Sequence, residues 1–190
     1  MSETLHGITL VTLTVSTLAP CTDFCYLGCN VGDSKRAFQR RRQVAWGAAR
    51  KLTTVWNLEA SDAAKMQLFQ STVQTVLLYS CEALTLTDTL ASRLDASHCS
   101  LVRYCLGVRF PERLSSTDLY VRAQVAPATT TLKRCRLHIV GHALRRPEVP
   151  LAVLLHPKNQ PSEPFRRGGA LRRTYYSQIT DDLNSMGLTR

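Results

Sequence analysis

The sequence predicts a mainly α-helical protein that begins with a β-hairpin and ends in a single helix after a proline-rich connector. Through most of the chain, apolar residues recur at intervals of three and four, which is the period of an amphipathic helix. Thr and Val dominate residues 8–17, which favours β-strands. Five prolines fall between positions 147 and 164, which indicates an extended, exposed segment.

Residues 1–32 are expected to contain the β-hairpin. The first strand lies within residues 8–17, and the extended pattern resumes at Phe24-Cys25-Tyr26-Leu27-Gly28. Ala19-Pro20-Cys21 would close the hairpin between them. An isolated hairpin is only marginally stable in water, so this one must pack on the helices that follow or on another sheet.

Residues 33–146 are expected to form a helical bundle. Asp33 and Ser34 can cap a first helix that runs to about Trp56. The later helices are expected to start at Ser61, at Thr87, at Ser115 or Ser116, and at about Thr131. Gly107 suits the end of the third helix. The proline- and arginine-rich connector spans 147–173, and a C-terminal helix lies within 174–190.

The charge pattern points to nucleic acid. The chain has a formal net charge of +10, and arginine, which pairs bidentately with phosphate, supplies most of the basic residues. Residues 34–56 and 133–146 are both basic and free of acidic residues, which predicts two contact surfaces. The alternatives are ordinary solvated helix faces and, less favoured, an anionic membrane surface.

RNA, DNA or an RNA–DNA hybrid is therefore the expected partner, and a membrane is not. Trp46 could stack on a base, although a tryptophan on a helix more often packs against its neighbours. The predicted nucleic-acid-binding residues in the two basic blocks are Arg40, Arg41, Arg42, Arg50, Lys51, Lys133, Arg134, Arg136, Arg145 and Arg146.

Catalytic groups are not predicted in this chain. Two-metal phosphoryl transfer needs paired carboxylates, and the one adjacent pair, Asp181-Asp182, falls in the expected C-terminal helix. No glycine-rich phosphate loop is present. No metal or other cofactor is therefore expected to belong to this chain.

A zinc site is weighed against ordinary packing. Cys135, His138 and His142 would share one helix face and could supply three zinc ligands, but a buried, hydrogen-bonded histidine pair is the default interpretation. The seven cysteines are odd in number, which argues against a disulfide framework and for a reducing intracellular compartment, the nucleus or the cytoplasm.

Six short motifs, in order, resemble non-LTR (LINE-type) retrotransposon reverse transcriptases. The first is the Phe24–Gly28 segment, which is similar to the family's Phe-x-Tyr-Leu-Gly primer grip. The second is the arginine-rich helix that ends in Leu52 and Trp56, which looks like the family's first thumb helix. The others are Val76–Glu82, similar to Leu-Leu-Tyr-Gly-x-Glu with Ser80 in place of Gly; Leu94-Asp95 with Leu101–Val108; Arg136–Arg145, similar to Arg-Leu-x-x-x-Gly-His-x-x-Arg; and Arg166–Gly168 with Thr174-Tyr175 and Asp182-Leu183.

The resemblance implies the end of the palm, the thumb and the post-thumb region of an RNA-directed DNA polymerase. It implies that Tyr26, Leu27 and Gly28 hold the primer end and that the basic helices grip the template–primer backbone. The family's Asp-Asp dyad and its magnesium would lie in a palm, which with the fingers would be a partner missing from this chain. Two alternatives are a stand-alone nucleic-acid-binding protein, with residues 116–145 imitating a helix-turn-helix, and a non-functional product of a decayed element.

Overall fold

A long helix, α1 (Ser34–Lys51), opens the helical part of the computed structural model and is continued by the short α2 (Thr53–Trp56). The structure describes residues 4–5, 8–9, 25–26, 29–30, 33–109, 111–146, 148, 150–155 and 173–187. Asp33 caps α1 as predicted, because its carboxylate accepts hydrogen bonds from the backbone amides of Lys35 (2.9 Å) and Arg36 (3.0 Å).

The second helical segment is interrupted by a wider turn. Ser61 caps α3 (Asp62–Phe69), a π-helical turn η1 (Gln70–Gln74) follows, and α4 (Thr75–Leu78) completes the segment. The segment ends at Tyr79, as predicted, and Ser80 then takes a left-handed conformation with φ of 63°. A short 3-10 turn, η2 (Cys81–Ala83), leads toward the third helix.

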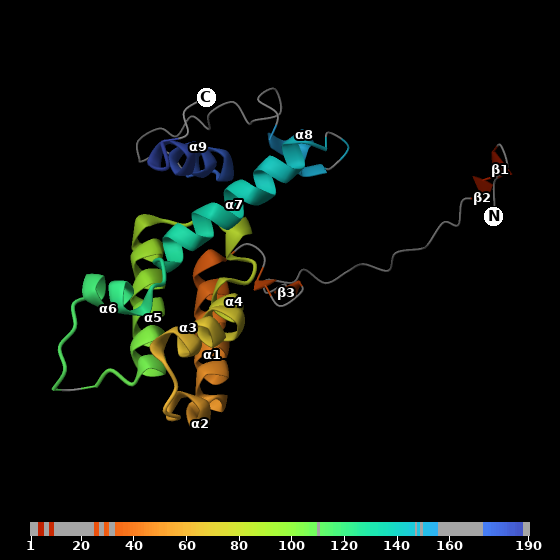
Figure 1. Cartoon of the computed structure of the whole chain (residues 1–190). Helices are drawn as coiled ribbons and strands as arrows, with labels where there is room; N and C mark the ends of the chain where they lie inside the picture. The colour runs from red at the N-terminus through yellow and green to blue at the C-terminus, as the bar shows by residue number, and fades with distance from the viewer. Residues whose placement is uncertain are drawn as a thin grey trace.

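The next three helices also follow the predicted caps. Thr87 caps α5 (Asp88–Leu106), and Gly107 ends it in the left-handed region. Ser115 caps α6 (Ser116–Ala123), as its hydroxyl accepts a hydrogen bond from the Asp118 amide at 3.1 Å. The helix α7 (Ala128–Leu144) starts directly after Pro127, three residues earlier than expected, and crosses the other helices (Figure 1).

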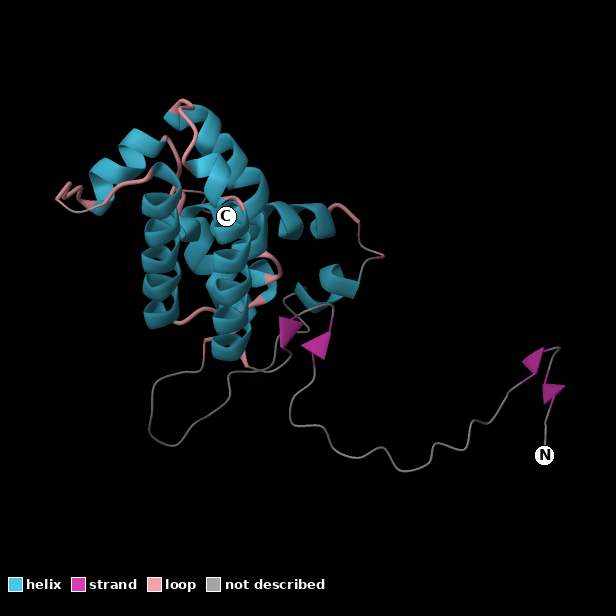
Figure 2. Ribbon diagram, turned by 90° about the horizontal axis from the view of Figure 1, so that it is seen from below, coloured by secondary structure: helices cyan, strands magenta, loops and turns pink. Residues whose placement is uncertain are grey.

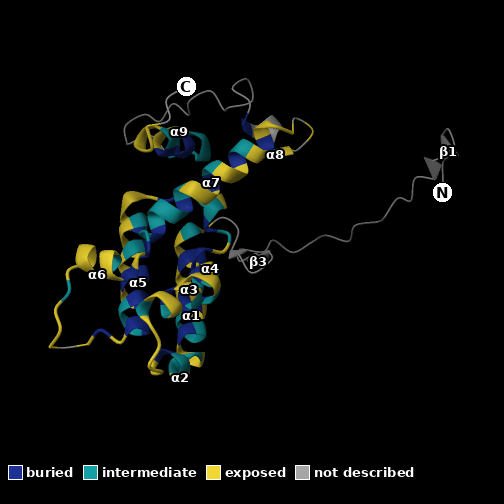
Figure 3. Ribbon diagram, in the orientation of Figure 1, coloured by how far each residue is buried: buried dark blue, intermediate teal, exposed yellow. Residues whose placement is uncertain are grey.

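One large hydrophobic core holds α1 to α6 and the first half of α7 together. Phe69, Leu77, Leu101 and Leu119 are among its fully buried side chains. Figure 3 shows the buried positions along the facing sides of α1, α4 and α5, with exposed positions on their outer sides. The apolar sides of these helices therefore face the interior of the bundle. No helix in the described residues is long and apolar enough to cross a membrane.

A second, smaller cluster lies beyond the crossing helix. It joins α7 to α8 (Pro150–Leu155) and α9 (Tyr175–Ser185) through Val140, Leu155 and Ile179. The predicted extended connector is therefore wrong for residues 150–155, because proline is well tolerated in the first turn of a helix and Pro150 starts α8. The C-terminal helix is confirmed, and Thr174 caps it.

The predicted N-terminal hairpin is wrong. The structure has two separate pairs of very short strands, β1 (Thr4–Leu5) with β2 (Ile8–Thr9) and β3 (Cys25–Tyr26) with β4 (Cys29–Asn30). Each strand pairs with the next one along the chain, so the segment around Ile8 does not pair with the segment around Tyr26 (Figure 2). Pairing strands that are close in the sequence costs less loop-closure entropy than pairing residues 8 and 26 would. The mainly α-helical class holds.

Candidate nucleic-acid interface

The longest two described helices, α1 and α5, pack against each other and leave a groove between them. Its volume is about 950 Å³. We call it the α1–α5 groove. Its lining residues are Lys35, Phe38, Gln39, Arg42, Gln43, Trp46 and Arg50 from α1 and Arg93, Ala96, Ser97 and Ser100 from α5.

The α1–α5 groove is positively charged. Its lining includes four basic side chains, of Lys35, Arg42, Arg50 and Arg93, and no acidic one. All four residues are exposed, and none forms an ion pair with a carboxylate in the described part of the chain. Their charge is therefore available to an anionic ligand, and arginine can bind phosphate through two parallel hydrogen bonds.

Trp46 packs inside this groove and does not offer a free ring. Its indole meets the Tyr104 ring edge-on at a centroid distance of 5.5 Å, and the Arg50 guanidinium lies 5.8 Å from its centroid. Tyr104 is itself held by a 2.8 Å hydrogen bond between its hydroxyl and that of Thr53. Trp46 therefore positions Arg50 by a cation–π contact, and the packing interpretation fits it better than base stacking.

The predicted cluster Arg40–Arg42 does not act as one surface. Successive residues of a helix point about 100° apart, so only Arg42 of the three lines the groove. The guanidinium of Arg41 instead lies over the Tyr79 ring at 4.3 Å. Arg50 joins Arg42 in the groove, whereas Lys51 is exposed outside its lining.

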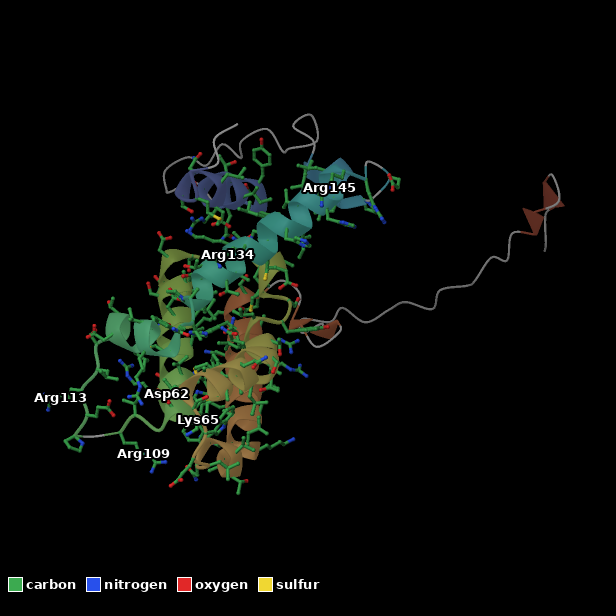
Figure 4. All side chains as sticks on the ribbon, viewed as in Figure 1. Asp62, Lys65, Arg109, Arg113, Arg134 and Arg145 are labelled. Atoms are coloured by element: carbon green, nitrogen blue, oxygen red, sulfur yellow. The ribbon has the colours of Figure 1, made fainter. Side chains whose placement is uncertain are left out.

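Three of the five basic residues predicted on and after α7 are at the surface. Arg134, Arg145 and Arg146 are exposed, and Figure 4 labels the first two along α7. Lys133 is half-buried, and its ammonium donates a 3.0 Å hydrogen bond to the Ser185 hydroxyl of α9. None of the four lines the α1–α5 groove.

Arg136 is not available to a ligand, and its assignment as a nucleic-acid contact is corrected. It is only 1% exposed and forms a buried ion pair with Asp182 of α9. Its Nε donates to the Glu82 carbonyl at 3.2 Å. A charge taken out of water needs such partners, and these partners come from segments distant in the sequence.

The histidine prediction is also corrected. His138 and His142 are both exposed, as is Cys135, so the pair is neither buried nor part of the core. No group of three possible metal ligands occurs within the described residues. Of the predicted primer-grip residues, Tyr26 lies in β3, and Leu27 and Gly28 fall outside the residues that the structure describes.

Two basic residues of the groove, Lys35 and Arg93, are not among the residues that the sequence predicts to bind nucleic acid. Lys35 stands in the first acid-free block, and its four- and seven-residue spacings to Gln39 and Arg42 could have placed it on their face. Arg93 belongs to the mildly acidic middle of the chain. Only the packing of α5 against α1 brings it to the groove, so no local signal marks it.

A buried polar network lies behind the groove wall. His98, the neighbour of Ser97, is fully buried between Gln74 (Nε2 to Oε1, 3.3 Å) and Tyr120 (Nδ1 to hydroxyl, 3.1 Å). Burial lowers the pKa of His98 to about 4, although the nearby Asp95 carboxylate acts in the opposite direction. The imidazole is therefore neutral near pH 7 and serves as a core hydrogen-bonding group.

Several residues of the ordered motifs set the backbone or join distant segments. Ser80, where the resembling motif has glycine, takes the left-handed conformation that glycine adopts most easily. The Asp95 carboxylate accepts hydrogen bonds from the Thr129 amide (2.9 Å) and hydroxyl (2.7 Å) in the first turn of α7. Arg136 and Asp182, from two separate motifs, form the buried ion pair.

Comparisons with known proteins give one informative likeness. No protein-family model matches the chain, and no solved structure matches it significantly. A protein from Caenorhabditis elegans, described as uncharacterized and transposon-derived, is 28% identical to this chain over 131 residues. The match covers 65% of this chain and 47% of the relative, so the chain spans about half the length of that protein. The chain is thus similar to a protein of transposon origin.

Proposed function

We propose that this chain is the thumb-like part of a retrotransposon reverse transcriptase and that its α1–α5 groove binds the backbone of the template–primer. The carrying observation is the groove itself, which collects basic side chains from two helices and no acidic side chain. Such a surface neutralises phosphates with little dependence on sequence. A template–primer is a ligand of that kind.

Three further observations support the assignment to this class of enzyme. The six motifs occur in the order expected for LINE-type reverse transcriptases, and the relative from Caenorhabditis elegans is described as transposon-derived. The left-handed conformation of Ser80 also suits a position at which the resembling motif has glycine.

The proposal assigns binding, and not DNA synthesis, to these residues. Phosphoryl transfer by two metal ions needs carboxylates that can hold the cations. The α1–α5 groove has none in its lining. Any catalytic centre working with this groove would therefore have to hold its metal ions elsewhere.

Binding to an RNA–DNA hybrid tests the proposal directly. We expect the purified chain to bind a fluorescent blunt hybrid in an anisotropy titration, with an affinity that falls steeply as salt rises. Replacing Arg42, Arg50 and Arg93 together by alanine should weaken binding by about tenfold or more and should make the slope of log K against log salt shallower by roughly two to three units.

The matched control removes the same charge outside the groove. Lys65, Arg109 and Arg113, labelled in Figure 4, do not line the α1–α5 groove, and their joint replacement by alanine should change affinity far less. Failure of the unaltered chain to bind the hybrid at low salt would overturn the proposal. Equal losses in the two triple variants would show that net charge, and not the groove, governs binding.

A further inference from the structure

A second groove lies between the end of the second helical segment and α7. It has a volume of about 630 Å³, and we call it the α4–α7 groove. Leu78, Tyr79 and Ile139 supply apolar surface, and Arg134 and His138 supply polar groups from α7. It shares no residue with the α1–α5 groove, so it is a separate surface of the molecule.

Tyr79 gives this groove an aromatic platform. The residue ends α4, and its side chain remains 49% exposed even though the core begins at the neighbouring Leu78. The Arg41 guanidinium packs over the ring at 4.3 Å, which holds the ring in place from outside the groove lining. A nucleobase stacks on such a ring whatever its identity, because every base has a π-face.

The wall opposite this platform can receive a phosphate. Arg134 and His138 are four residues apart on α7, so their side chains lie on the same face about one turn apart. Both are exposed, and neither forms an ion pair in the described part of the chain. Glu82 is the one acidic residue in the groove lining, so basic and neutral groups predominate there.

Two uncharged groups in the lining suit a ribose. Thr131 donates its hydroxyl hydrogen to the Pro127 carbonyl at 3.3 Å, which leaves the oxygen able to accept a further hydrogen bond. The exposed Gln70 amide can both donate and accept. A ribose 2′-hydroxyl is both donor and acceptor, and deoxyribose lacks it.

We propose that the α4–α7 groove binds one unpaired nucleotide of an RNA strand, with its base stacked on Tyr79 and its phosphate on Arg134 and His138. The inference rests on the proposed function in one respect, since the RNA is the unpaired extension of the template that the α1–α5 groove holds as a hybrid. It adds a second site, with its own ligand, to the same body.

The test compares hybrids that differ only at one end. A blunt RNA–DNA hybrid, the same hybrid with a short unpaired RNA extension, and one with a DNA extension are titrated by anisotropy. We expect the RNA extension to raise affinity about tenfold, which corresponds to one stacked base. Tyr79→Leu and Arg134→Ala should each remove this gain and leave binding of the blunt hybrid unchanged.

Conservative and control variants keep the result interpretable. Tyr79→Trp should retain the gain because it preserves a stacking surface, and Arg113→Ala should retain it because Arg113 lies outside the groove lining. If Tyr79→Leu lowers the melting temperature, Arg134→Ala still tests the inference. Arg134 is exposed, so its truncation should remove the phosphate contact without destabilising the fold.

Failure of this inference is distinct from failure of the proposed function. A chain that binds the blunt hybrid but gains nothing from the RNA extension would overturn the inference alone. An equal gain from the DNA extension would overturn the assignment of the site to RNA. Absence of blunt-hybrid binding would instead overturn the proposed function.

Discussion

The main bundle and the C-terminal unit of α8 and α9 are held by different forces. The bundle has a continuous core from Phe38 to Leu132, whereas the described residues of α8 and α9 add only Leu155 and Ile179 as buried apolar residues, which pack with Val140 of α7. The other contacts that hold this unit to the bundle are hydrogen bonds and ion pairs, including the buried ion pair of Arg136 with Asp182. Apolar burial fixes the bundle as a whole, while the C-terminal unit depends on a few directional contacts.

Those directional contacts converge on one stretch of backbone. Gln178 accepts a hydrogen bond from the Leu86 amide at 2.9 Å, and Arg173 donates to the Leu86 carbonyl at 3.1 Å. Arg173 also pairs with Asp181 (2.9 Å) and Asp88 (2.8 Å), and the hydrogen bond to Asp181 is the first cause of its raised pKa. The backbone just before α5 is thus the surface to which α9 and the residues before it bind.

Phe69→Ala should have the largest effect, because it opens a cavity in the bundle core. Phe69 is fully buried, and such truncations cost about 3–5 kcal/mol of unfolding free energy. Chemical denaturation should report this loss as a lower midpoint for the whole bundle. A loss confined to α8 and α9 would contradict the assignment of Phe69 to the main core.

Arg136→Ala should cost a comparable or smaller amount, locally. The change leaves Asp182 buried without its partner, which typically costs about 3–5 kcal/mol. Hydrogen exchange should speed up in α9 while the amides of α3 and α5 stay protected. Pairing Arg136→Met with Asp182→Leu should recover most of the loss, and continued instability of the double variant would show that the charges themselves are required.

Acid should weaken the bundle through His98. The folded-state pKa of about 4 lies below the ordinary 6.5, so the unfolded chain binds the proton more readily. The contribution of neutral His98 to the free energy of unfolding is fully present above pH 6.5. It is lost as the pH falls toward 4, by up to about 3 kcal/mol. Urea unfolding between pH 7.5 and 4.5 measures it. The His98→Gln variant should show a smaller dependence on pH in this window, and an unchanged slope would exclude His98 as the cause.

Ser80→Gly should give the smallest change, and a favourable one. Ser80 has φ of 63°, a region that costs L-residues about 1–2 kcal/mol and glycine almost nothing. Glycine also loses more entropy on folding, so we expect a net gain of less than about 1 kcal/mol in unfolding free energy. Gln124→Gly, at φ of 52°, is the matched comparison. Destabilisation by Ser80→Gly would contradict this backbone assignment.

Local features could be predicted from the sequence, and long-range ones could not. Asp33, Ser61, Thr87 and Ser115 were identified as caps because capping depends on residues within one turn. Arg136 was misassigned because its partner, Asp182, is 46 residues away.

The candidate site divides in the same way. Arg42 and Arg50 stand in an acid-free block that is visible in the sequence, and they do line the groove. Arg93 reaches the same groove only through the packing of α5 on α1. The Thr- and Val-rich composition of residues 8–17 favours strands but does not specify their partners, and the structure pairs strands that are close in the sequence.

The π-helical turn Gln70–Gln74 makes the effect of a change in chain length depend on where the change falls. Such a turn holds one residue more than a regular α-helix does. Deleting one residue there can therefore restore a regular α-helix and keep Leu77 in the core and Tyr79 at its groove, whereas one more inserted residue would rotate the residues after it by about 100°. Within the segment from Ser61 to Ser80, loss of one residue at this turn should thus be the best tolerated change in length, and descendants of the same ancestor should preserve the spacing on either side of it.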